Sequence, residues 1–82
     1  MLVELSPKAK KYFLNLDKDK QDRIKKTLIK LSLEPPQGDI KALAGKDGFR
    51  LRVGGYRVLF GIKNETIVIT DIAPRGQVYK GR

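Results

Sequence analysis

Four arginines and one tyrosine in the second half of the chain are the residues best suited to act on a phosphate. In chain order they are Arg50, Arg52, Arg57, Arg75 and Tyr79. A guanidinium group is permanently charged and can hold a phosphate through two parallel hydrogen bonds. A tyrosine beside such cations can stack on a nucleobase or transfer a proton, although a tyrosine near a chain end is more often a packing residue. The pattern predicts a phosphate-binding site.

The residues that the chain lacks narrow its chemistry. It has no histidine and no cysteine, which excludes Ser-His-Asp and Cys-His catalysis, disulfides and thiolate zinc sites. Any acid–base step must therefore use lysine, arginine, tyrosine or a carboxylate. We expect neither a metal nor a cofactor.

Length and charge favour one small domain with an anionic partner. The 82 residues predict a single domain over residues 1–82. Lysine and arginine number 18 against 9 acidic residues, and the net charge of +9 favours nucleic acid, an acidic protein or an anionic surface as partner. No apolar run approaches the ~20 residues of a membrane span, and no signal peptide is recognisable. We expect a cytoplasmic protein with no membrane partner.

The first half of the chain is typical of a strand followed by two helices. Residues 2–5 predict a short edge strand. Ser6 followed by Pro7 predicts the start of one helix, and Asp17 the start of a second that Pro35-Pro36 stops. The apolar residues at helical spacing are Ala9, Phe13 and Leu16 in the first helix and Ile24, Leu28 and Leu31 in the second. Residues 34–48, rich in proline and glycine, predict a loop.

From Phe49 the apolar residues recur at every second position. The alternation predicts strands over 49–53, 56–62 and 66–72, joined by turns at Gly54-Gly55 and Asn64-Glu65. The predicted fold class is α+β: a helical hairpin packed on one face of a small antiparallel sheet, in the order β-α-α-β-β-β.

The two-residue turn fixes which residues face each other. Arg52 lies opposite Arg57 and Arg50 opposite Leu59, so three arginines share the face away from the helices. Like charges directly opposite destabilise a sheet, which favours a phosphate cradle on this face. The alternative is that the guanidinium groups extend into water, beside Asp71 or Glu65.

Three stretches resemble the RelE/ParE toxin superfamily. Phe49-Arg-Leu-Arg-Val-Gly-Gly-Tyr-Arg-Val-Leu-Phe60 resembles the central hairpin of that superfamily, and Ile72-Ala-Pro-Arg-Gly-Gln-Val-Tyr79 resembles its closing Arg-x-x-Val-Tyr element. The opening Leu5-Ser-Pro-Lys-Ala-Lys-Lys-Tyr-Phe and the helical hairpin match its layout, so the resemblance covers nearly the whole chain.

The resemblance implies a RelE-like fold and the toxin of a type II toxin–antitoxin pair. RelE-like members cut mRNA in the ribosomal A site, where the ribose 2′-OH attacks the adjacent phosphate and leaves a 2′,3′-cyclic phosphate. They use lysine, arginine and tyrosine in place of histidine. The implied partners are the ribosome, mRNA and an acidic antitoxin. Two alternatives are a ParE-like inhibitor of DNA gyrase without RNase activity, and a degenerate toxin that only binds ribosomes or RNA.

The resemblance also implies roles for single residues. Arg57 would stabilise the phosphate, Arg50 matches a basic position on the preceding strand, Arg75 would neutralise the leaving oxygen, and Tyr79 would stack on a base or move protons. Gly48 stands where well-known members carry a second catalytic lysine. The other basic residues expected to bind RNA or the ribosome are Arg52, Lys46, Lys80, Arg82, Lys10, Lys11 and Lys25, of which Lys46 or Lys80 could replace the missing lysine.

Overall fold

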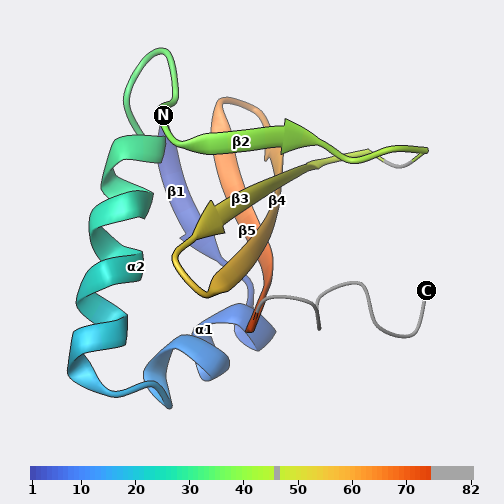
Figure 1. Cartoon of the computed structure of the whole chain (residues 1–82). Helices are drawn as coiled ribbons and strands as arrows, with labels where there is room; N and C mark the ends of the chain where they lie inside the picture. Colours follow the sequence, from blue (N-terminus) through green and yellow to red (C-terminus); the bar gives the residue numbers. More distant parts are fainter. Residues whose placement is uncertain (46, 75–82) are drawn as a thin grey trace.

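The computed structural model describes residues 1–45 and 47–74, which form two helices and five strands (Figure 1). The predicted α+β class, with a helical hairpin after the first strand, is confirmed. In chain order the elements are β1 (Leu2–Leu5), α1 (Pro7–Leu14), α2 (Lys18–Leu31), β2 (Asp39–Ala42), β3 (Phe49–Val53), β4 (Tyr56–Lys63) and β5 (Thr66–Pro74).

Side-chain caps start both helices at the predicted residues. The Ser6 hydroxyl accepts a hydrogen bond from the Ala9 backbone N–H at 3.2 Å, and Pro7 occupies the first helical position of α1. The Asp17 carboxylate accepts one from the Lys20 backbone N–H at 3.1 Å and starts α2. Each cap satisfies a backbone donor that has no partner inside its helix. α2 ends at Leu31, before the proline pair that was expected to stop it.

The strands form one mixed sheet in the order β1-β5-β4-β3-β2. β1 lies at one edge, as expected, and runs parallel to β5, whereas the other neighbouring strands are antiparallel. The sheet thus differs from the expected antiparallel one at β1. The long helical crossover after β1 permits this, because parallel neighbours need a connection of a dozen or more residues.

β2 is an additional strand in the segment that was expected to be a loop. It pairs with β3 from Asp39 opposite Arg52 to Ala42 opposite Phe49. Only one of its four side chains, that of Ile40, is partly buried. The alternation Asp-Ile-Lys-Ala covers only four residues in a segment rich in proline and glycine, which is too short to predict a strand. Antiparallel pairing with β3, the next strand along the chain, is what makes it one.

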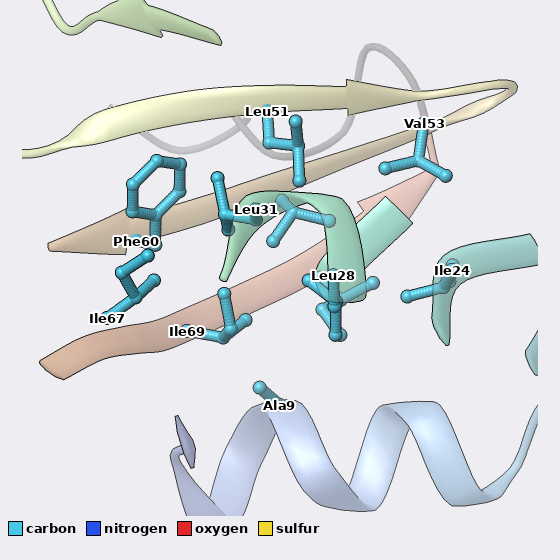
Figure 2. Packing of buried hydrophobic residues seen from close by; sticks show 11 residues of the cluster. Ala9, Ile24, Leu28, Leu31, Leu51, Val53, Phe60, Ile67 and Ile69 are labelled. Carbon is cyan, nitrogen blue, oxygen red and sulfur yellow. The ribbon is translucent and has the colours of Figure 1, made fainter. Parts of the chain in front are cut away.

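The core lies between the helices and one face of the sheet (Figure 2). The helices contribute Ala9, Ile24, Leu28 and Leu31 to it. The sheet contributes Leu51, Val53, Val58, Phe60, Ile67, Ile69 and Ile72. The predicted inward residues of both helices and of β3 are confirmed. Leu16 also packs against the core, although it lies beyond the end of α1. Because strand side chains alternate, the neighbours of these residues point to the opposite face.

Candidate phosphate-binding site

The opposite face of β2–β5 gathers the three predicted arginines. Val53 pairs with Tyr56, Arg52 with Arg57 and Arg50 with Leu59, which confirms the register expected from the two-residue turn. We call this surface the arginine face; its members are Asp39, Lys41, Arg50, Arg52, Arg57, Leu59, Asp71 and Ala73. Gly54 has a φ of 55°, a value that glycine tolerates and that this tight turn requires.

β2 adds two residues to the arginine face that sequence reasoning missed. Lys41 lies directly opposite Arg50, and Asp39 lies directly opposite Arg52. Both were overlooked because their segment was expected to be a loop. The apolar fragment around Ile40 was the only sequence signal that could have indicated a strand.

Arg50 is the most buried charged residue of this face. Only 7% of its surface is exposed, and its Nη1 is buried without a hydrogen-bond partner among residues 1–45 and 47–74. A cation removed from water without compensation lowers stability. An anion that reached Nη1 would satisfy this donor, which makes Arg50 a candidate anion ligand.

Arg52 and Asp71 are paired with opposite charges. Arg52 Nε lies 3.9 Å from Asp39 Oδ2, and both side chains are well exposed. Asp71, which was a suggested neighbour of the arginines, lies on the same face but has Lys8 Nζ 3.5 Å from its Oδ2. Exposed pairs of this kind contribute little stability, so neither holds the face rigidly.

Arg57 lies near the start of β4, the middle strand of the sheet. It is half-buried, with Arg52 opposite it on β3 and Ala73 opposite it on β5. Glu65, the other carboxylate suggested as a neighbour, lies in the turn at the far end of β4.

Gly48 is held in a conformation that disfavours any side chain. Its φ is 111°, and a Cβ at this position would lie 3.1 Å from the Phe60 carbonyl oxygen. This backbone therefore excludes a lysine at position 48 without a local shift. A recess of about 490 Å³ adjoins it and is lined in part by Gly48, Leu59, Gly61 and Thr70.

The predicted helical lysines lie away from the arginine face. Lys10 and Lys11 belong to α1 and Lys25 to α2, and both helices pack on the inner side of the sheet (Figure 1). Lys10 borders a recess with Glu4 and Leu5, and Lys25 borders another with Val3 and Leu5. Their predicted RNA contacts would thus form a separate surface.

Five predicted site residues lie outside the described residues: Lys46, Arg75, Tyr79, Lys80 and Arg82. Their roles stay predictions.

Tyr12 and Tyr56 are tyrosines on the core side, with ring centroids 6.4 Å apart in an edge-to-face arrangement. Burial, reinforced by Tyr56, raises the pKa of Tyr12. Tyr12 therefore keeps its proton at neutral pH and is a poor general base.

Two negative findings apply to residues 1–45 and 47–74. No three histidine, cysteine, aspartate or glutamate side chains are grouped so as to hold a metal ion. No helix is long and apolar enough to span a membrane.

Comparison of the sequence with models of known protein families shows to which family this chain belongs. The family model for the ParE toxin of the type II toxin–antitoxin system parDE matches residues 3–79. The chain belongs to the RelE/ParE toxin superfamily. It is therefore a toxin of the type II toxin–antitoxin class. No curated protein sequence matches it.

Solved structures similar to this toxin share its fold over nearly the whole chain. A chain of the archaeal RelE–RelB complex from Pyrococcus horikoshii OT3 is 27% identical, with a TM-score of 0.77 over 93% of this chain and 96% of that one. A chain of the RelBE2 complex from Mycobacterium tuberculosis is 26% identical, with a TM-score of 0.77 over 90% and 96%. The isolated Escherichia coli RelE toxin is 20% identical, with a TM-score of 0.76 over 95% and 89%, and shows likeness of fold alone.

Proposed function

We propose that this toxin is a ribosome-dependent mRNA endoribonuclease that cuts in the A site. The proposal rests on Arg50, which is buried and lies on the same face as Arg57. Among the described residues, Arg50 Nη1 has no hydrogen-bond partner. Such a cluster would stabilise the negative charge that develops on a phosphate during cleavage.

The proposed reaction is an internal transesterification. The ribose 2′-oxygen forms a bond to phosphorus, the bond from phosphorus to the 5′-oxygen breaks, and the products are a 2′,3′-cyclic phosphate and a 5′-hydroxyl. Arg50 and Arg57 would contact the non-bridging oxygens. We retain the expected roles of Arg75 near the leaving oxygen and of Tyr79 as a stacking or proton-transfer group. The ribosome would align the 2′-oxygen for attack.

We also propose a cognate antitoxin with net negative charge. The similar chains from Pyrococcus horikoshii and Mycobacterium tuberculosis are parts of RelE–RelB and RelBE2 complexes. The net charge of +9 on this toxin would attract an acidic partner and speed its association.

Inhibition of DNA gyrase is the second candidate function. The match to a ParE toxin family model favours it. It would need no phosphate chemistry and gives no reason for a buried, unsatisfied Arg50.

Two assays of one preparation separate the candidates. Primer extension in a purified translation system should reveal breaks at the A-site codon that require both toxin and ribosomes, while the supercoiling activity of purified gyrase should be unchanged. Intact message together with blocked supercoiling would overturn the endoribonuclease proposal and support the gyrase inhibitor. Intact message with stalled translation would indicate a toxin that only binds.

A further inference from the structure

We propose that Lys41 is a further catalytic residue of this toxin, which donates a proton to the 5′-oxygen that leaves when the RNA strand is cut. The inference rests on the proposed endoribonuclease function. It depends on β2, the strand that sequence reasoning missed.

The sheet register sets Lys41 beside the buried arginine. Lys41 lies directly opposite Arg50 in the antiparallel pair of β2 and β3, and side chains so paired share a face, with Cβ atoms about 5 Å apart. β2 is the outer strand of the sheet and Lys41 is exposed. An RNA phosphate over Arg50 could therefore be reached by the Lys41 ammonium from the open edge.

The two carboxylates of the arginine face are paired with cations other than Lys41. Asp39, two residues earlier on the same face, has its Oδ2 3.9 Å from Arg52 Nε. Asp71, on the same face, is paired with Lys8. Among residues 1–45 and 47–74, Lys41 forms no ion pair within 4.0 Å, so its charge is free to act on a bound phosphate.

The chemistry of the leaving group selects lysine over arginine. A departing 5′-alkoxide is strongly basic and must be protonated as the bond to phosphorus breaks. A guanidinium group is a poor proton donor in proteins, whereas an ammonium group can donate a proton to a strong base. Of the cations that the strand register places next to Arg50, only Lys41 carries an ammonium group, which donates a proton more readily than a guanidinium group.

Solvent and Lys41 together supply and remove the protons of the proposed cleavage. The 2′-hydroxyl gives its proton to a solvent base as the bond from the 2′-oxygen to phosphorus forms. The bond from phosphorus to the 5′-oxygen breaks, and the Lys41 ammonium gives that oxygen a proton. Solvent then protonates the Lys41 amine again. Arg50 and Arg57 hold the non-bridging oxygens throughout and exchange no protons.

A lysine at this position has an alternative, purely structural use. Lysines on edge strands discourage unwanted pairing with another chain. That role predicts no effect on the rate of cleavage, so a kinetic test separates the two.

The test compares two messages in single-turnover cleavage on programmed ribosomes. One carries an ordinary linkage at the cut site, and the other carries a 5′-bridging sulfur, which leaves as a thiolate without needing a proton. We expect Lys41→Ala to slow the ordinary message about 100-fold and the sulfur message less than about threefold. Lys41→Arg should stay slow on the ordinary message, because a guanidinium group holds its proton. Lys63→Ala, at the far end of β4, is the matched control and should cleave both messages as the wild type does.

Three results would overturn the inference. Wild-type rates for Lys41→Ala on the ordinary message would mean that Lys41 serves only the strand edge. Equal losses on both messages would mean that Lys41 binds RNA without donating the proton. If the wild-type toxin cuts neither message on ribosomes, the proposed function itself fails and the inference falls with it.

Discussion

Arg50 is placed where a charged side chain is costly. Its neighbours leave 7% of it exposed, and Nη1 has no hydrogen-bond partner among the described residues. Arg52, two positions along the same strand, has a side chain that is 39% exposed and pairs with Asp39. The charge of Arg50 should therefore lower the free energy of unfolding, whereas the charge of Arg52 should leave it almost unchanged. Mutating each to the same residue compares the two positions.

Arg50→Met should stabilise the fold while it abolishes cleavage. Replacing the buried, unsatisfied cation by an apolar side chain of similar length removes a desolvation penalty. We expect the free energy of unfolding to rise by about 1 kcal/mol, and Tm by about 4–8 °C for a domain of this size. Urea and thermal unfolding measure both. Arg52→Met, the control, should change the free energy of unfolding by less than about 0.5 kcal/mol, and a lower Tm for Arg50→Met would contradict the account.

Arg57→Ala should remove activity without unfolding the toxin. A preorganised cation that stabilises transition-state charge is worth about 10²–10³ in rate, so cleavage on ribosomes should fall by that factor. Lys63→Ala, on the same strand and face, should be fully active. Undiminished cleavage by a folded Arg57→Ala toxin would remove Arg57 from the site.

β2 and the loop that follows it position Asp39 and Lys41 on the arginine face. Leu43 N–H donates to the Gly48 carbonyl oxygen at 3.1 Å and closes this loop. The φ of 111° at Gly48 and the Phe60 carbonyl oxygen, 3.1 Å from a Cβ at this position, would strain and crowd any side chain. The loop therefore holds β2 in register with β3 through a conformation that only glycine adopts easily.

Gly48→Ala should destabilise the toxin by about 1–3 kcal/mol, since the residue would be strained and its Cβ crowded against backbone. Gly55→Ala is the control, because its φ lies outside the left-handed region and nothing lies within 4 Å of a Cβ there. Chemical denaturation of both variants measures the difference. Equal stabilities would show that the loop adjusts freely and does not fix β2.

Among the strands, the hairpin of β3 and β4 could be predicted from the sequence, whereas β2 could not. Gly54-Gly55 and the alternation around it fix a register through local chemistry. Asp39, Lys41 and Ala42 are exposed, and the polar–apolar alternation of β2 covers only four residues beside a stretch rich in proline and glycine. Their strand exists because β3 supplies partners, so Lys41 could enter the site only once the sheet was known.

Over the whole molecule, the sheet separates a packed face from a charged one. The sequence predicted this division, because apolar alternation and the tight turn together determine which side chains point inward. It could not predict the burial of Arg50, which depends on all the neighbours of that side chain. Tyr79 and Arg75, which would complete the proposed site, lie outside the described residues, and their roles rest on resemblance.

We propose that this toxin cuts message through phosphate chemistry on the arginine face. The mass of the new 3′ end, measured after wild-type toxin acts on ribosomes programmed with one defined A-site codon, tests this proposal. We predict a fragment that ends in a 2′,3′-cyclic phosphate, formed by the wild type and reduced about 10²–10³-fold in rate by Arg57→Ala. Intact message, or a new end bearing a free 3′-hydroxyl, would contradict it.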